Sequence, residues 1–170
     1  MIHENVICAG YPTVLALDLG NPFGWAFNVG TDIESGFLQM PEEIEESYFL
    51  RWLNDFLSIG KVSAVVFENA AYQPANAIQR WHSQRGIMAA ICQSHDIAYG
   101  GIDVGTWKKH VVGFANFSKP TRKAEKLNYM VIKALAIHAI IVEDHNEADA
   151  IGVLLAALET GVVERVGESS

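Results

Sequence analysis

Two apolar runs that each lead into a carboxylate constrain this sequence more than any other feature. Thr13 to Leu19 reads TVLALDL and carries Asp18 near its end, and Lys61 to Phe67 (KVSAVVF) is followed directly by Glu68. Short apolar runs rich in branched residues predict buried strands. If the two strands are neighbours in one sheet, their ends meet at the carboxyl edge, where α/β folds place their chemistry. The sequence therefore predicts an α/β fold with two acids at one sheet edge.

The rest of the pattern predicts a mixed sheet flanked by helices. Further strands are expected at 23–29 and 33–40, joined by a turn at 30–32, and at 97–104. Helices are expected between Pro41 and Gly60, from about 74 to 94, and at 105–114, 121–140 and 146–158. A meander followed by strand–helix–strand units gives a sheet with an antiparallel and a parallel half. Because no repeat or linker interrupts the chain, residues 1–170 are expected to form one domain.

A third acid lies near the start of the last predicted helix. The stretch DHNEADAIGVLLAALE has an apolar face, and Asp149 and Asn146, three residues apart, project to one side of it. A buried carboxylate is costly unless it is paired, hydrogen-bonded or bound to a cation. If this helix crosses the strand ends, Asp149 converges with Asp18 and Glu68, and Asn146 lies at the margin. Oxygen ligands of this kind suit Mg²⁺ or Mn²⁺ and not zinc.

Each acid also has a purely structural interpretation. Asp18 can cap the turn through Gly20, Glu68 can begin a solvated loop, and Asp149 can serve the dipole of its helix. Taken singly, these interpretations are at least as good as a functional one. The joint occurrence of acids on a strand, a second strand and a helix is what favours a site.

The charge distribution bears on possible partners. The net charge of −8 argues against nucleic acid when taken alone, because phosphate binding needs clustered Lys and Arg. However, the segment from Arg80 to Lys133 holds nine basic and three acidic residues, against three basic and seventeen acidic ones elsewhere. This asymmetry indicates an electropositive face, although a solvated helix surface explains it equally well.

Cysteine usage and hydropathy bear on the compartment. Cys8 and Cys92 are far apart and have no metal-ligand spacing, which favours reduced thiols in an intracellular protein over a disulfide. No apolar run approaches the roughly 20 residues of a membrane span, and the N-terminus lacks the pattern of a signal peptide. The sequence therefore predicts a cytoplasmic protein that has no membrane partner.

Four segments resemble the successive motifs of a known family. ALDLGNPFGWA, VVFENA, GTWKKHVVGFANFSK and NEADAIGVLLAA are similar, in this order, to RuvC-type Holliday junction resolvases, particularly their divergent bacteriophage forms. The ordered set of motifs spans nearly the whole chain. The resemblance implies a ribonuclease H-like fold with a mixed five-stranded sheet flanked by helices. It also implies a homodimeric, divalent-metal-dependent endonuclease that resolves branched DNA by paired nicking, in a bacterial cell or a phage-infected host.

Carried over to this sequence, the resemblance assigns the catalytic residues. Asp18 matches the first-strand aspartate, Glu68 the glutamate, and Asp149 the last aspartate of the family, so these three are the implied metal ligands. Two metal ions about 3.5–4 Å apart would activate a water and stabilise the leaving oxygen. The family usually has an acid or a histidine where this chain has Asn146, which leaves the second metal site open. Its other candidates are Asp144, His145 and Glu147.

The resemblance also suggests which residues contact DNA. Lys108, Lys109 and Lys119 resemble basic positions of the family near the DNA, where lysines neutralise phosphates without reading sequence. Arg80 and Arg85 on the long helix either touch DNA or are simply exposed. For Lys108 and Lys109 the alternative is a solvated helix face.

Three rival functions remain at this stage. The first is a junction-binding relative whose chemistry has been altered at Asn146. The second is a ribonuclease H-like nuclease for flaps or other substrates, which the spacing of the acids does not exclude. The third is a kinase or ATPase suggested by ALDLGNPFG, and it ranks low because 170 residues leave no room for a second lobe.

Overall fold

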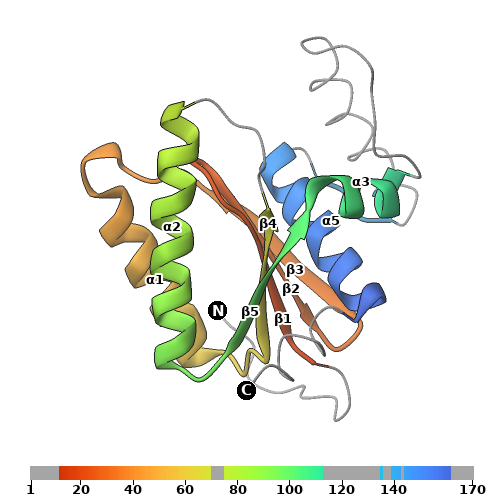
Figure 1. The fold of residues 1–170 in the computed structure, drawn as a ribbon. Coiled ribbons are helices and arrows are strands. Elements are labelled where there is room, and N and C mark those ends of the chain that lie inside the picture. Colours follow the sequence, from red (N-terminus) through yellow and green to blue (C-terminus); the bar gives the residue numbers. More distant parts are fainter. Residues whose placement is uncertain (1–11, 70–74, 113–134, 136–138, 143, 162–170) are drawn as a thin grey trace.

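A five-stranded mixed sheet forms the centre of the molecule (Figure 1). The computed structural model describes residues 12–69, 75–112, 135, 139–142 and 144–161. Strands β1 (Val14–Asp18), β2 (Phe23–Val29) and β3 (Asp32–Leu38) form an antiparallel meander. Strands β4 (Ala64–Asn69) and β5 (Ala98–Asp103) continue the sheet in parallel from β1, in the order β3-β2-β1-β4-β5. The expected mixed α/β sheet is confirmed.

Helices cover both faces of this sheet (Figure 1). The short 3-10 helix η1 (Glu42–Ile44) leads into α1 (Glu45–Ile59), which lies with α2 (Ala75–Ser94) on one face. Helices α3 (Val104–Val112) and α5 (His145–Thr160) lie on the other face. Most of the helix expected at 121–140 is outside the described residues. Among the helices that are described, none has both the length and the apolarity that a membrane span requires.

The alternation of side chains along β1 sends Asp18 to the α5 face. Val14 and Ala16 belong to the apolar core beneath α5, whereas Leu15 and Leu17 belong to the core beneath α1 and α2. Successive side chains of a strand point to opposite faces. Asp18, two residues after Ala16, therefore follows Val14 and Ala16 onto the α5 face.

The same alternation places Glu68 beside it. Val66 belongs to the core beneath α5, so Glu68, two residues later on β4, faces α5 as well. Strands β1 and β4 are parallel neighbours with Leu17 opposite Phe67, which brings the next residues, Asp18 and Glu68, side by side at the carboxyl edge. The juxtaposition of the two acids expected from the sequence is confirmed.

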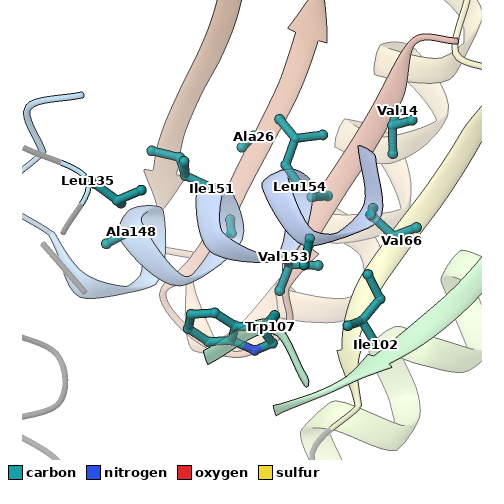
Figure 2. Packing of buried hydrophobic residues seen from close by; sticks show 14 of the residues in the cluster. Val14, Ala26, Val66, Ile102, Trp107, Leu135, Ala148, Ile151, Val153 and Leu154 are labelled. Atoms are coloured by element: carbon teal, nitrogen blue, oxygen red, sulfur yellow. The ribbon is translucent and has the colours of Figure 1, made fainter. Parts of the chain in front are cut away.

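Small residues let α5 lie close to the sheet. Gly24 pairs with Asp18 in the β1–β2 ladder, and a Cβ atom at Gly24 would collide with the backbone carbonyl of Asn146 at the start of α5. The helix contacts β2, β1 and β4. Figure 2 shows its buried side chains between Val14, Ala26 and Val66 of the strands and Trp107 of α3. This close approach brings Asp149 to the sheet edge.

The opposite face is packed by larger side chains. Ile44, Tyr48, Trp52 and Phe56 recur at helical intervals in the sequence, which predicts the helix that α1 forms. The buried residues of α1 are Phe49, Leu53 and Leu57. Tyr48, Trp52 and Phe56 pack partly buried beside them, and Ile44 is 49% exposed. Because α1 packs on both the sheet and α2, its apolar surface is wider than one row of side chains.

Candidate active site

Glu68 is held by two indole groups. Its side-chain oxygen Oε2 accepts a hydrogen bond of 2.8 Å from Nε1 of Trp107 on α3. Its backbone carbonyl accepts a bond of 3.2 Å from Nε1 of Trp81 on α2. Glu68 therefore belongs to β4 as a half-buried, hydrogen-bonded residue, and the interpretation as the start of a solvated loop is wrong.

Asp149 reaches the same edge from α5. The helix begins at Asp144, whose side chain accepts hydrogen bonds from the backbone N–H groups of Asn146 and Glu147 and so caps the first turn. Asp149 lies further along the helix and is only 8% exposed. Its Oδ2 lies 3.9 Å from Nζ of Lys108, and its buried Oδ1 has no hydrogen-bond partner among the described residues. The helix-dipole role considered for Asp149 is therefore filled by Asp144.

Asp18 does not hold the turn that follows it. That turn is held by Asn21, whose Oδ1 accepts a hydrogen bond of 2.8 Å from the backbone N–H of Met40. Among the described residues, no hydrogen bond satisfies the Asp18 side chain. An acid at this position is costly without a partner, which supports a functional interpretation over a turn cap.

Burial raises the pKa of all three acids, and neighbouring charges add to this at Asp18 and Asp149. Burial, followed by the charges of Glu68 and Asp149, raises the pKa of Asp18 well above its usual value. Burial also raises the pKa of Asp149 to about 7, against the lowering effect of the nearby Lys108 ammonium. The pKa of Glu68 is raised by burial as well, although Lys108 and the Trp107 hydrogen bond oppose this. The three carboxylates therefore form one cluster whose negative charge is incompletely neutralised.

Lys108 is the basic group inside this cluster. Its side chain is 13% exposed, and its Nζ lies 4.8 Å from the centre of the Trp107 ring as well as near Asp149. The solvated helix face considered for Lys108 is therefore wrong, whereas Lys109 is exposed as that alternative expects. Sequence reasoning missed both the internal position of Lys108 and the role of Trp107. The one signal in the sequence is that Trp107 and Lys108 are adjacent in GTWKKH.

The remaining predicted DNA-contacting residues lie in different surroundings. Nε of Arg80 lies 2.6 Å from Oε1 of Glu45 on α1, so this arginine joins two helices on the face opposite α5. Arg85 is exposed, with its guanidinium 5.4 Å from the centre of the Trp81 ring. Lys119 is outside the described residues. The structure therefore does not place Arg80 and Arg85 on one face with Lys108.

The residues weighed for a second metal site differ in what they contact. The Nδ2 of Asn146 donates to Asp144 Oδ1 at 3.1 Å, Glu147 Oε1 accepts a bond of 2.7 Å from Ser35 on β3, and His145 is exposed. Asp144 is the one whose charge raises the pKa of both Asp18 and Asp149. Asp144 is thus the fourth acid of the cluster, although its Oδ1 also caps α5.

The donor set suits a hard divalent cation. All three acids offer oxygen ligands, their pKa values are raised where no cation neutralises them, and Asp149 keeps a buried oxygen without a partner. Among the residues that the structure describes, no three His, Cys, Asp or Glu side chains are already grouped so that they could hold a metal ion. The donor chemistry of the three acids fits Mg²⁺ or Mn²⁺, although their side chains are not arranged as a formed metal site.

Comparison with solved structures shows where this fold occurs. RuvC from T. thermophilus, in complex with a Holliday junction substrate, matches with a TM-score of 0.65 and 16% sequence identity, over 89% of this chain and 96% of that chain. The Holliday junction resolvase of fowlpox virus matches with a TM-score of 0.53 and 12% identity, over 87% and 98% of the two chains. No protein-family model matches the chain, and no curated protein matches its sequence. The ribonuclease H-like fold is therefore confirmed.

Proposed function

We propose that this protein is a divalent-metal-dependent endonuclease that cuts branched DNA, with the four-way junction as its preferred substrate. The observation that carries the proposal is the cluster of Asp18, Glu68 and Asp149. They come from β1, β4 and α5 and meet at the carboxyl edge of the sheet, and the charge of Glu68 raises the pKa of both Asp18 and Asp149. The shared fold with proteins whose described substrate is a Holliday junction supports the choice of DNA.

In this proposal the three acids hold Mg²⁺ or Mn²⁺. A divalent cation at such a site activates a water and stabilises the charge that develops on the scissile phosphate, and two cations can share this work. Asp144 is the acid best placed to help hold a second cation, because its charge already acts on Asp18 and Asp149. Asn146 then serves the first turn of α5 through its bond to Asp144.

The basic residues position the DNA. Lys109 is exposed on α3, next to the internal Lys108, and would neutralise phosphates near the acids. We propose that Lys119, which lies outside the described residues, also neutralises DNA phosphates. Arg85 is the arginine of α2 better exposed for this purpose, because Arg80 is engaged by Glu45. Binding of this kind weakens as salt concentration rises.

Paired nicking requires two copies of the chain. One cluster of acids can cut one strand at a time, so symmetric cuts in two strands of a junction need two sites related by a two-fold axis. A homodimer is therefore part of the proposal.

The test is a cleavage assay with the purified protein. A synthetic four-way junction, a linear duplex and a flap are incubated with the protein in Mg²⁺, in Mn²⁺ or in EDTA. We expect paired nicks in the junction that require metal. Asp18→Asn and Asp149→Asn should each reduce the rate about 10³-fold or more, because the stabilisation that a bound metal supplies is worth several kcal/mol. Asp55→Asn, which changes an exposed acid on α1, is the matched control and should cut normally.

Two outcomes would contradict the proposal. Tight junction binding without cutting in any metal would indicate a junction-binding protein whose chemistry is altered at Asn146. Equal cutting of flaps and junctions would indicate a nuclease with another preferred substrate.

A further inference from the structure

Trp107 connects the parts of the acid cluster. It is fully buried on α3, its indole N–H donates to the carboxylate of Glu68 on β4, and the next residue, Lys108, pairs with Asp149 on α5. We propose that Trp107 is a positioning residue that fixes the side chain of Glu68, so that one carboxylate oxygen is held by the indole and the other remains available to the metal. This inference rests on the proposed metal-dependent function.

The hydrogen bond is the only one that the buried indole makes among the described residues. A fully buried N–H group that lacks an acceptor loses the water it would otherwise contact, which costs free energy. A bond to an ionised carboxylate is stronger than one to a neutral acceptor. Trp107 and Glu68 therefore restrict each other, and the rotation of Glu68 is limited before any metal binds.

The ring itself is held in place by α5. Figure 2 shows the Trp107 ring against α5. A Cβ atom at Gly152 would lie 2.6 Å from Cε3 and Cζ3 of Trp107, so only glycine allows the indole to lie this close to the helix. Gly152 follows Asp149 by three residues and is on the same side of α5. The Trp107 ring therefore links the position of α5, and with it Asp149, to the carboxylate of Glu68.

A second tryptophan provides a control of matched chemistry. Trp81 is also buried and its indole also donates to Glu68, but to the backbone carbonyl instead of the side chain. Replacing either tryptophan by phenylalanine removes an indole N–H and leaves a smaller ring. Only Trp107→Phe frees the carboxylate.

The first measurement is the nitrogen–proton NMR spectrum of the four indole groups, which needs neither metal nor DNA. Glu68→Gln replaces the charged acceptor of the Trp107 bond with a neutral one. We expect it to shift one indole signal strongly and to leave the others nearly unchanged, and Trp107→Phe should remove that same signal. If no indole signal shifts in Glu68→Gln, the bond does not restrict Glu68 and the inference fails.

The second measurement is the affinity for Mg²⁺, determined by calorimetry on the complete chain. We expect Trp107→Phe to bind Mg²⁺ about 10-fold more weakly, as is typical when a group that orients a ligand is removed. Trp81→Phe should bind with the affinity of the wild type. In the cleavage assay, Trp107→Phe should need correspondingly more Mg²⁺ for half-maximal rate, while its rate at saturating Mg²⁺ is retained.

Failure of the inference and failure of the proposed function give different results. Wild-type protein that cuts junctions, together with a Trp107→Phe variant of unchanged Mg²⁺ affinity, overturns the inference alone. An equal loss of affinity in both tryptophan variants also overturns it, because the loss would then reflect packing. If the wild-type protein binds Mg²⁺ but cuts no DNA, the proposed nuclease function is wrong. The Mg²⁺ affinities of the two tryptophan variants then still test the role of Trp107. If Trp107→Phe does not fold, the indole shift in Glu68→Gln decides.

Discussion

The two faces of the sheet use the same strands but are packed by side chains of very different size. On the α1 and α2 face, neighbouring aromatic rings lie with centroids 4.8 to 6.5 Å apart. This aromatic face includes Phe23, Phe49, Trp52, Phe56, Phe67 and Trp81. The α5 face is packed mainly by alanine, valine, leucine and isoleucine, with Gly24 against the backbone of α5 and Gly152 against the Trp107 ring. Trp107 is the one aromatic residue of its buried cluster among the described residues.

The difference shows how one sheet combines stability with chemistry. The distance between packed elements depends on the side chains at their contact, so small residues let α5 approach the strands closely. Because of that approach, Asp149 lies near Asp18 and Glu68. Large aromatic groups bury more area but would keep a helix too far away for such a cluster. We therefore expect the aromatic face to determine mainly stability, and the α5 face to determine activity.

Phe49→Ala should produce the largest loss of stability. Phe49 is fully buried in the aromatic face, and truncation of a buried phenylalanine typically costs about 3–5 kcal/mol. Urea unfolding measures this cost. Below the unfolding transition, cleavage per folded molecule should equal that of the wild type, because no acid moves. Loss of cleavage in folded Phe49→Ala would show that the two faces are not separable.

Gly24→Ala should have the opposite effect to Phe49→Ala, with a smaller loss of stability and a larger loss of cleavage. The added methyl group meets the backbone of Asn146, and overpacking of this kind costs about 1–3 kcal/mol. Because α5 must move away from β2, Asp149 leaves the cluster and most of the metal-dependent cleavage should be lost. The assay is junction cleavage at a temperature where the variant is folded.

Gly86→Ala is the matched control for this glycine. Gly86 is exposed on α2, and a Cβ atom there meets nothing within 4 Å. Alanine should therefore stabilise the helix by about 0.5–1 kcal/mol and leave cleavage unchanged. If Gly24→Ala also cuts normally, the close approach of α5 is not what assembles the site.

The elements and the convergence of the acids could be predicted because they depend on local patterns. The apolar runs of β1 and β4, each leading into an acid, predict two strands with Asp18 and Glu68 at one edge, and the apolar face of the segment around Asp149 predicts a helix packed on the sheet. These signals need only neighbouring residues. The strand bounds at 23–29 agree fully with β2 for this reason.

The surroundings of the acids could not be predicted in the same way. The bond between Trp107 and Glu68 joins residues 39 positions apart, and it depends on how α3 packs against α5. Nothing local to Gly152 indicates that an indole ring lies against it. A lysine next to a tryptophan on a short helix has the same local pattern whether it faces solvent or, like Lys108, three carboxylates. Such contacts are set by tertiary packing.

Asp149→Asn should stabilise the metal-free protein at pH 8. The folded-state pKa of Asp149 is raised to about 7 from the usual 3.8, so the folded protein retains a proton that the unfolded chain has released. The stability contributed by this proton is fully present below pH 3.8 and is lost as the pH rises through 7. Asparagine carries no charge and avoids that loss, so the free energy of unfolding of the variant should exceed that of the wild type. A difference of about 1 kcal/mol would raise the melting temperature by about 2–4 °C.

Thermal unfolding in EDTA measures this effect. The difference between Asp149→Asn and wild type should shrink as the pH is lowered to 5, and saturating Mg²⁺ should stabilise the wild type more than the variant. Asp55→Asn on α1 should show none of these changes. A destabilised Asp149→Asn at pH 8 would mean that its contact with Lys108 outweighs the cost of burying the carboxylate.

The smallest predicted effect concerns Cys92 in the aromatic face, whose thiol we expect to be unreactive in the folded protein. This buried cysteine is free of disulfides, and burial raises the pKa of its thiol to about 12. At pH 8 the thiolate is then only about one part in 10⁴. In a Cys8→Ser variant, where Cys92 is the remaining cysteine, we therefore expect no reaction with a thiol reagent until the protein unfolds.

The reaction rate of Cys92 therefore reports opening of the aromatic face. It should rise in Phe49→Ala and fall in Asp149→Asn, since the first destabilises the fold and the second relieves buried charge. A fast reaction in the Cys8→Ser background would show that the aromatic face opens without global unfolding, and the stability of the molecule would then have to come from the α5 face.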